Sequence, residues 1–395
     1  MLQKFIHTVE AVISGKSRAP AMEIALEALS IGYGTAVSLR RSLYETGLLP
    51  RYRLPCFVIS VGNVTVGGTG KTPMVIRIAN LLMLHGFRVA VLSRGYGGGA
   101  ETAGTIVSDG NGMIREARLA GDEPALIGRS CPGVPVLAGK NRIHSGKLAC
   151  ERFHPECIVL DDGFQHLALH RDVDLVLLDA HRPAGNGHLL PRGPLREPLA
   201  ALRSADAFVL TRSGLAGDVP VPTLDVPPLG KPIFRSNHRE MIRGLVHPGQ
   251  AIDVLPVAGE GDSNSGLISG RRVYRFSGIA DNARVDASIE KLGAIIVGKM
   301  DFRDHHFYDD REIAVIEAEA SRCHAEMVLT TEKDAVRLMG WAAFSIPLGI
   351  VGIVLEMIPE DRLAFETWLL NLARAKTERQ RIRVGKETGW SADSD

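Results

Sequence analysis

One segment near the start of the chain constrains its fold more than any other. Residues 57 to 72 read as a short apolar strand, then a glycine-rich turn, then the start of a helix. The glycines of this turn allow backbone conformations that direct several N–H groups at one anion. A strand, a turn of this kind and a helix in this order form the phosphate-binding loop of an α/β sheet. The segment therefore predicts a fold that binds a nucleoside triphosphate.

The residues at the end of this loop have separate predicted roles. Lys71 can reach the β- and γ-phosphates, and the hydroxyl of Thr72 can bind Mg²⁺. The usual pattern has glycine five residues before Gly70, where this chain has Thr65, so the glycines lie closer to the lysine than usual. An incidental glycine turn is the alternative, but the helical apolar pattern that follows argues against it. The loop residues expected to surround the phosphates are Gly67, Gly68, Thr69, Gly70, Lys71 and Thr72.

The composition bounds the class of protein. With 395 residues, of which 45% are hydrophobic and 23% charged, the chain is ordinary globular material, long enough for two domains. A net charge of +1 gives no argument for a nucleic-acid partner. The five cysteines contain no Cys-x-x-Cys pair, which predicts neither a disulfide framework nor a zinc site. A reducing cytosol fits this cysteine usage best.

Strands and helices alternate along the rest of the chain. Short apolar runs separated by helical stretches predict a parallel sheet covered on both faces. We expect an α/β protein with a P-loop NTPase-type parallel sheet domain, followed by a second, smaller α/β domain. The expected strands lie at 89–93, 134–138, 157–160, 173–178 and 207–211, and then at 273–276, 294–297, 327–330 and 350–355.

Loop-forming stretches suggest where the domains begin and end. A proline-rich stretch at 220–232 predicts an interdomain connection, and a Gly/Ser-rich stretch at 259–270 predicts a surface loop. Asp109 to Gly112 has the composition of a hairpin turn. The expected parts are a helical leader at 1–50, the P-loop domain at 51–215, a connection at 216–240, the second domain at 241–375 and a charged, mobile tail at 376–395.

Residues 20 to 50 have two interpretations. No secretory signal is visible, and no apolar run is long enough to span a bilayer. An apolar stripe with arginines near its end can form an interfacial helix whose basic side chains meet lipid headgroups. Those arginines are Arg40, Arg41, Arg51 and Arg53. The alternative is a helix packed on the first domain, and the periodicity favours this alternative.

Polar residues follow the expected strands at the edge where open parallel sheets bind their ligands. Asp161 and Asp162 come directly after an apolar strand, and Gln165 and His166 follow them. An apolar strand that ends in aspartate is how such folds hold the Mg²⁺ that the loop threonine also binds. A single exposed aspartate would be ordinary loop chemistry, whereas this cluster predicts a metal site.

Three further clusters are less specific. Asp122, followed by Glu-Pro and an apolar run, has the pattern of a helix N-cap, and from this pattern alone capping is favoured. The loop from 186 to 197 carries Arg192 and Arg196, which suit phosphate contacts, although a solvated loop is a fair alternative. His305 and His306 are adjacent, so their side chains diverge, and one histidine oriented by a carboxylate is more plausible than a two-histidine metal site.

Eight motifs, in order over roughly residues 20 to 370, together resemble the tetraacyldisaccharide 4'-kinase family, the lipid A 4'-kinases of Gram-negative bacteria. They are GNVTVGGTGKTP at 62–73, SRGYG at 93–97, GDEP at 121–124, LDDGFQH at 160–166, LPRGPLRE at 190–197, FSGIA at 276–280, DHH at 304–306 and TEKD at 331–334.

The chain departs from the family pattern in its leader. This segment is richer in Ala, Ser and Glu than a strongly apolar membrane arm would be.

The resemblance implies a reaction. The family transfers the γ-phosphate of ATP to the 4'-hydroxyl of a tetraacyldisaccharide 1-phosphate, a lipid A precursor, and gives lipid IV-A. It acts peripherally at the cytoplasmic face of the inner membrane, with ATP and Mg²⁺ and with no protein partner inferred. Asp122 falls on the position of the catalytic base, in place of a capping role, and His305 on that of its partner.

The resemblance also assigns further site residues. Lys71 and Thr72 would hold the triphosphate and its metal, and Asp161 or Asp162 would complete the metal site. Other residues on active-site positions are Gln165, His166, Arg196 and Glu197. Because the histidine belongs to the second domain, the reaction would need both domains, and closure over ATP is the implied conformational step.

Two other functions remain open at this point. One is a membrane-peripheral nucleotide switch, although such proteins typically carry a second lysine where this chain has Val66. The other is a soluble small-molecule ligase or kinase of similar fold, which a protein without a lipid-facing surface would favour.

Overall fold

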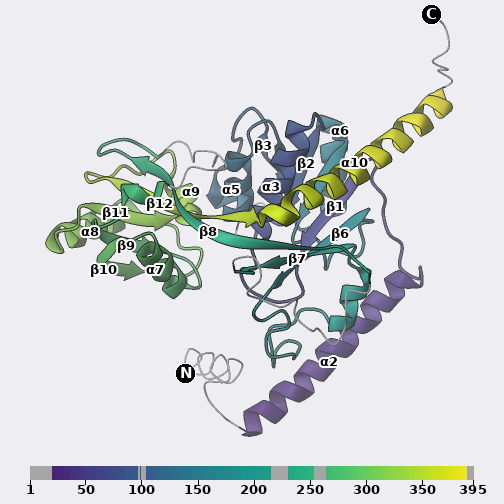
Figure 1. Ribbon diagram of the computed structural model, residues 1–395, viewed down its shortest axis with the longest axis horizontal. Coiled ribbons are helices and arrows are strands. Elements are labelled where there is room, and N and C mark those ends of the chain that lie inside the picture. Colours follow the sequence, from purple (N-terminus) through teal and green to yellow (C-terminus); the bar gives the residue numbers. More distant parts are fainter. Residues whose placement is uncertain (1–19, 97, 99–103, 215–229, 253–263, 389–395) are drawn as a thin grey trace, which may run out of the picture. The chain divides into compact units, whose positions relative to one another are not determined.

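The computed structural model describes residues 20–96, 98, 104–214, 230–252 and 264–388 (Figure 1). These residues form two compact units, and each unit is built from segments that are far apart in the sequence. The first unit contains the described residues up to Met74, those from Glu156 to Asn237 and those from Glu356 onward. The second contains Val75–Pro155 and the described part of His238–Leu355. The sequential domain boundaries given above stay a prediction.

The first unit has a parallel sheet at its centre. Its strand order is β8-β7-β6-β1-β5, and every neighbouring pair is parallel. The strands are β1 (Phe57–Gly62), β5 (Cys157–Asp161), β6 (Val173–Asp179), β7 (Ala207–Thr211) and β8 (Ile233–Val246), of which the part up to Asn237 lies in this unit. All six residues of β1 are buried, which explains why this strand reads as a continuous apolar run. The predicted parallel α/β sheet is confirmed.

Helices α2 (Pro20–Glu45) and α10 (Pro359–Thr388) and the short 3-10 helix η1 (Leu199–Ser204) complete this unit. Phe234 of β8 packs edge-on against Phe365 of α10, with ring centroids 5.2 Å apart. The tail expected from residue 376 begins inside α10. Helix α3 (Lys71–Leu84) starts in this unit, directly after the glycine-rich turn, as the sequence predicts.

The strands of the second unit form two groups, and the first group comes from residues 89 to 138. Strands β2 (Val89–Ser93) and β4 (Pro135–Ala138) pair in parallel, and β3 (Thr105–Asp109) pairs antiparallel to β4. The backbone N–H groups of Asn111 and Gly112 donate to Oδ1 of Asp109, at 2.8 and 3.1 Å, so the predicted turn is confirmed. The helices of this part are α4 (Ala117–Ala120), α5 (Asp122–Ser130) and α6 (Arg142–Phe153).

The rest of the second unit is built on the strand order β10-β9-β11-β12-β8. Four strands match the four apolar runs expected there, namely β9 (Arg272–Ser277), β10 (Ile295–Asp301), β11 (Met327–Thr331) and β12 (Leu348–Met357). Strand β9 pairs in parallel with β10 and β11, and β11 pairs in parallel with β12. The remaining elements are α7 (Asn282–Lys291), α8 (Asp310–Arg322), α9 (Glu332–Leu338) and the 3-10 helix η2 (Asn264–Leu267).

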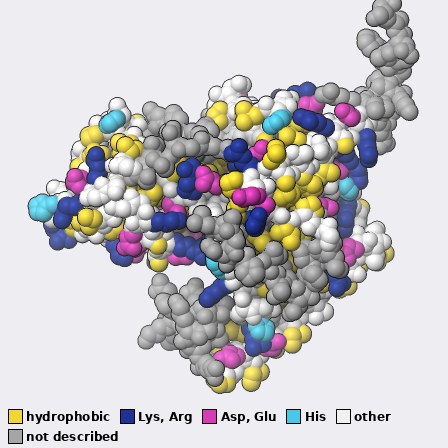
Figure 2. Space-filling view, viewed as in Figure 1, with side chains coloured by type: hydrophobic (Ala, Val, Ile, Leu, Met, Phe, Trp, Pro, Cys, Tyr) yellow, Lys and Arg dark blue, Asp and Glu magenta, His cyan; other side chains and the backbone are white. Residues whose placement is uncertain are grey.

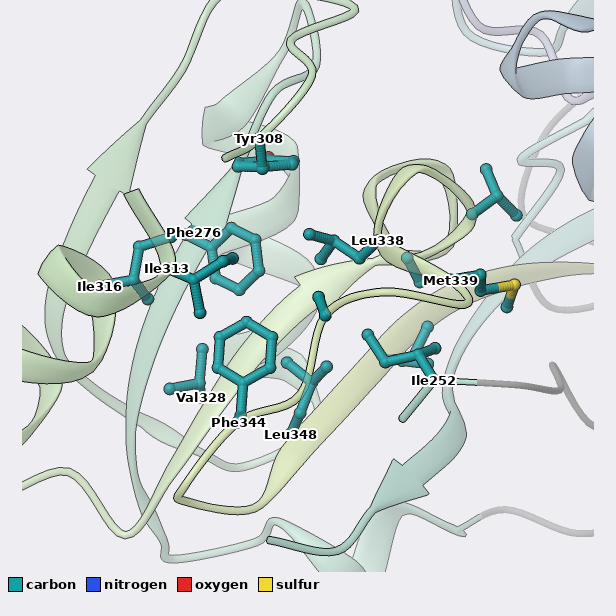
Figure 3. Packing of buried hydrophobic residues seen from close by; sticks show 14 of the residues in the cluster. Ile252, Phe276, Tyr308, Ile313, Ile316, Val328, Leu338, Met339, Phe344 and Leu348 are labelled. Carbon is teal, nitrogen blue, oxygen red and sulfur yellow. The ribbon is translucent and has the colours of Figure 1, made fainter. Parts of the chain in front are cut away.

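A hydrophobic cluster that includes several aromatic rings fills the core between these strands and helices (Figure 3). The rings of Phe276 and Phe344 stack with centroids 5.8 Å apart, and Tyr308 meets Phe276 edge-on at 5.3 Å. These geometries are the favoured ones for aromatic pairs. Tyr308 is therefore anchored by the core, while its hydroxyl is left to bond a polar group nearby.

The sequence analysis missed one strand, and parts of two stretches that it singled out are not described by the structure. Strand β8 was not predicted, because charged residues such as Arg235, Arg239 and Glu240 interrupt its apolar pattern. Most of the proline-rich stretch at 220–232 and the first half of the 259–270 loop lie outside the described residues. Among the described residues, no helix has both the length and the apolar character that a membrane span requires.

Candidate active site

The glycine-rich turn of the first unit has the backbone of a phosphate loop, which we define as residues 63 to 72. Gly67 and Gly70 have φ angles of 108° and 88°, in the region that strongly favours glycine. Helix α3 starts immediately after Gly70, whose carbonyl accepts the N–H of Met74 at 3.1 Å. The free N–H groups of a helix start, together with such a turn, favour an anion.

Asn63, which the sequence analysis did not single out, organises this loop. Its buried side chain donates from Nδ2 to Oγ1 of Thr69 at 2.9 Å, and its Oδ1 accepts from Nζ of Lys71 at 3.2 Å. Its backbone carbonyl accepts from Nε2 of Gln165 at 2.8 Å. Its sequence signals were its place directly after the apolar strand β1 and its position within the motif at 62–73. Asn63 thus links the loop lysine to the segment that follows β5.

Two acidic residues lie at the end of β5 with different surroundings. Asp161 is the last residue of β5, and it is buried. Asp162 accepts two hydrogen bonds from Arg196, from Nη1 to Oδ2 at 2.8 Å and from Nη2 to Oδ1 at 2.9 Å. Lys71 is also near, with Nζ 3.7 Å from Oδ1 of Asp162. The structure therefore places Arg196 and Lys71 around Asp162, and it ties Gln165 to Asn63 of the loop. The catalytic and metal-binding roles of these residues stay predictions.

The donors present fit a magnesium ion that shares its shell with phosphate. Mg²⁺ is usually held by one or two carboxylates together with substrate phosphates and water, rather than by a cage of protein ligands. The described residues contain no cluster of three or more His, Cys, Asp or Glu side chains arranged for a metal. Thr72 and Asp161 are both nearly buried and lie at the helix start and at the strand end of the same unit.

Arg212 is a second residue that the sequence analysis missed. It follows β7, donates from Nη2 to the carbonyl of Gly68 at 2.7 Å and also bonds Asp179 through Nη1. Burial raises the pKa of Asp179, but the backbone N–H of His181 and the Arg212 guanidinium outweigh it and lower the pKa below its usual value. Arg212 thereby adds a positive charge beside the phosphate loop.

Glu197, which the resemblance assigns to an active-site position, bonds two arginines of α2 in the structure. Its carboxylate accepts from Nε and Nη2 of Arg41, both at 3.3 Å, and both side chains are almost completely buried. Arg40 also reaches Glu197, at 3.5 Å. Glu197 therefore anchors helix α2 to the first unit. His166, also expected in the site, lies in the turn after β5, where its N–H donates to the carbonyl of Gly163 at 2.9 Å.

A second cluster lies within the second unit, around Asp122. Gly121, with φ 89°, is the N-cap of α5, and Asp122 is the first helical residue. Its carboxylate makes no capping bond, so the capping role that the pattern favoured is wrong. Instead, Oδ2 of Asp122 lies 2.6 Å from Nδ1 of His305, a residue 183 positions away. Arg337, which the sequence analysis missed, donates to both oxygens of the same carboxylate.

The two members of the Asp122–His305 pair shift each other's pKa in opposite directions. Burial raises the pKa of Asp122, but the hydrogen bonds from His305 and Arg337 outweigh it and lower the pKa below its usual value. The hydrogen bond to Asp122 raises the pKa of His305, although burial opposes this, and Asp304 adds to the rise. The pair is thus an ionised carboxylate with a histidine that readily holds a proton. This arrangement can exchange a proton with a bound hydroxyl.

Comparison with known proteins places the chain in one family. A family model of tetraacyldisaccharide-1-P 4'-kinase matches residues 22–374. A tetraacyldisaccharide 4'-kinase from Syntrophus aciditrophicus is 42% identical over 369 residues, which cover 91% of this chain and 95% of the relative. One from Geobacter metallireducens is 42% identical over 343 residues, covering 87% and 96%.

A solved structure agrees with these sequence matches. The crystal structure of LpxK from Aquifex aeolicus in complex with ATP matches with a TM-score of 0.69 and 32% sequence identity, over 89% of this chain and 99% of that one. The family resemblance that the motifs predicted is confirmed. With its phosphate loop, its Asp122–His305 pair and these matches, the chain belongs to the tetraacyldisaccharide 4'-kinase family.

Proposed function

We propose that this protein transfers the γ-phosphate of ATP to the 4'-hydroxyl of a tetraacyldisaccharide 1-phosphate, a lipid A precursor, and so forms lipid IV-A. Family membership over residues 22–374 is the observation that carries this proposal. The phosphate loop and the Asp122–His305 pair supply the two chemical functions that such a transfer needs, which are triphosphate binding and proton acceptance.

The first unit would hold the triphosphate. The N–H groups of the phosphate loop and Lys71 bind the β- and γ-phosphates, and Arg212 adds positive charge next to Gly68. Thr72 and Asp161 would hold Mg²⁺, which, when bound, offsets negative charge on the phosphate oxygens. Arg196 occupies both oxygens of Asp162, so we assign the direct metal contact to Asp161 and the orientation of Arg196 to Asp162.

The second unit would take the proton. A sugar hydroxyl is a weak acid, so it loses its proton mainly as the phosphoryl group is transferred. We assign Asp122 as the base, with His305 as the partner that orients it and tunes its basicity. Because the two belong to a coupled pair, the pH dependence of turnover belongs to the pair and not to one residue. The proposed base belongs to the second unit, and the residues that would bind the triphosphate belong to the first.

One labelling experiment tests the function. The purified protein is incubated with γ-labelled ATP and Mg²⁺, with tetraacyldisaccharide 1-phosphate or without an acceptor. We expect label in the lipid, and little release of inorganic phosphate when the acceptor is left out. Release of phosphate at the same rate with and without lipid, and no labelled lipid, would instead support a nucleotide switch. The Lys71→Ala variant serves as the control for contaminating kinases.

We further propose that helix α2 contacts the cytoplasmic face of the inner membrane, where the acylated acceptor would lie. The buried residues of α2, which face the rest of the first unit, are Leu26, Ser30, Gly34 and Arg41. Other apolar side chains of the helix are more than half exposed, namely Ile24, Leu29, Ile31 and Leu39. Figure 2 shows hydrophobic and acidic side chains side by side where Figure 1 places the start of α2. Exposed apolar side chains on one helix favour burial at a lipid interface.

The expectation that Arg41 meets lipid headgroups is wrong, because this arginine is buried against Glu197. The test therefore changes apolar residues. A triple variant, Ile24→Gln, Ile31→Gln and Leu39→Gln, should bind anionic liposomes more weakly and raise the apparent KM for lipid while ATP binding stays unchanged. Leu84→Gln, at an exposed leucine of α3, is the matched control. Equal liposome binding by the triple variant and the parent would contradict membrane contact through α2.

A further inference from the structure

The TEKD motif at Thr331–Asp334 has no role in the function proposed above, yet its helix, α9, reaches the proposed base. We propose that Arg337, held in place by Asp334, is a positioning residue that fixes the Asp122 carboxylate in the orientation needed for proton transfer. This inference rests on the proposed role of Asp122 as the base, and it concerns contacts made entirely within the second unit.

Arg337 donates two hydrogen bonds to the Asp122 carboxylate. Its Nε donates to Oδ1 of Asp122 at 2.9 Å, and its Nη2 donates to Oδ2 at 2.5 Å. Both side chains are buried, with 0% of the Arg337 side chain and 2% of the Asp122 side chain exposed. Two parallel bonds from a planar guanidinium fix the plane of a carboxylate, which a single bond cannot do.

The other end of the guanidinium is fixed as well. Nη1 of Arg337 donates to Oδ1 of Asp334 and to the carbonyl of Gly278, both at 2.9 Å. Asp334 is itself held by the hydroxyl of Tyr308 at 2.8 Å, by that of Thr331 at 2.6 Å and by the N–H of Gly278 at 3.0 Å. Burial raises the pKa of Asp334, whereas the Arg337 guanidinium and these donors oppose the rise. The aromatic core thus anchors the chain of contacts through Tyr308.

Helix α9 makes a second ion pair with the start of α5, next to the one between Arg337 and Asp122. Lys333 lies four residues before Arg337, and its Nζ is 2.9 Å from Oε1 of Glu123. Residues four apart lie on one face of a helix, so two cations of α9 hold two adjacent carboxylates at the start of α5. The lysine and arginine therefore hold the first two residues of α5, and of these two cations only Arg337 contacts the base.

Charged groups of three elements surround Asp122. Arg337, Lys333 and Asp334 lie on α9, and Glu123 lies on α5 itself. His305 and Asp304 belong to the loop after β10. The bonds to Arg337 and His305 are the direct ones, and the arginine is the charge that stays constant with pH.

The bonding pattern also limits where a hydroxyl can bind. A carboxylate has about four acceptor positions. Three of those on Asp122 are used, one on Oδ1 by Arg337 and two on Oδ2 by Arg337 and His305. With Arg337 in place, the acceptor hydroxyl would meet Oδ1. Without it, the carboxylate could rotate and present either oxygen, which lowers the fraction of productive encounters.

A conservative variant tests this role. Arg337→Lys keeps the charge but cannot make two parallel bonds, so we expect kcat to fall roughly tenfold, as for loss of a charge-assisted hydrogen bond. The KM for ATP should not change, and the acidic limb of the kcat pH profile should move to higher pH, because a donor that lowers the pKa of Asp122 is lost. Arg243→Lys is the matched control, since Arg243 is also buried and bonds a carboxylate of α9, Glu332, at 2.7 Å.

Two comparisons decide the outcome. A folded Arg337→Lys enzyme with the parent kcat and pH profile would overturn the positioning role, and if Asp122→Asn is inactive in the same assay, the base assignment survives. Should Arg337→Lys not fold, Asp334→Asn replaces it, because that change keeps the shape and an acceptor oxygen. We expect Asp334→Asn to lower kcat several-fold at unchanged KM for ATP, and a parent-like kcat in that folded variant would overturn the proposal.

Discussion

The phosphate loop and the Asp122 cluster are built in opposite ways. In the loop, Asn63 bonds residues six and eight positions further on, although Gln165 and Arg212 add distant contacts. In the cluster, Asp122 bonds partners 183 and 215 positions away. A local site depends on backbone geometry that a few glycines specify, whereas a distant site depends on the fold of the whole unit. The first kind can be read from a short motif, and the second cannot.

The two largest expected effects come from Lys71 and Asp122, and removing the loop lysine tests the local site. Lys71→Ala should lower transfer by about 10²–10³-fold or more, because the group that offsets charge on the β- and γ-phosphates is lost. Transfer of label from ATP to tetraacyldisaccharide 1-phosphate measures the effect. Lys140→Ala, at an exposed lysine, is the control. Retained turnover in a well-folded Lys71→Ala protein would remove the loop from the mechanism.

Changing the base tests the distant site in the same assay. Asp122→Asn should lower kcat by about 10²–10⁴-fold, the usual range for general base catalysis, and raise the KM for lipid much less. The neighbouring Glu123→Gln breaks only the contact with Lys333 and should keep most of the activity. Near-normal turnover by Asp122→Asn would sink the assignment of this residue as the base.

A smaller effect separates two adjacent glycines of the loop. Gly67 has a φ of 108°, a conformation that costs an L-residue roughly 1–2 kcal/mol or more, whereas Gly68 has no such positive φ and has open space where a Cβ would be. Gly67→Ala should therefore weaken ATP binding about tenfold, and Gly68→Ala should change it much less. Titration with a fluorescent ATP analogue measures both. Equal losses would mean that side-chain volume, and not backbone geometry, limits the loop.

The same contrast explains how much the sequence could predict. Five strands are buried apolar runs, so the local sequence of apolar residues is enough to locate them. They are β1, β2, β5, β6 and β7. Strand β8 was missed because its charged side chains find partners, such as Asp361 for Arg235 and Glu332 for Arg243. From sequence alone, a charged residue is expected to be exposed unless its ion-pair partner is known. The partners of Arg235 and Arg243 are far away in the sequence.

The functional residues divide in the same way. The loop residues and Asp162 came from motifs, and the structure brings them together. Asp122 has the local pattern of a cap, and only the family resemblance pointed to a role with His305. Arg337 carried no local signal, since an arginine in a short helix usually faces solvent. Arg41 was misread for the same reason, because its carboxylate partner is 156 positions away.

The smallest predicted effect concerns stability, and it tests whether the distant pair forms in solution. The pKa of His305 is raised in the folded protein by Asp122, so its contribution to stability is complete below the unfolded histidine pKa of about 6.5 and is lost as pH rises through the folded value. His305→Ala should therefore lower Tm by about 2–4 °C at pH 6 and by less at pH 9. Scanning calorimetry of both proteins across this pH range measures the difference. The His306→Ala variant is the control, since His306 bonds Glu312 and not Asp122. A Tm difference that does not depend on pH would mean that His305 contributes packing alone, and that the carboxylate is held by Arg337 without it.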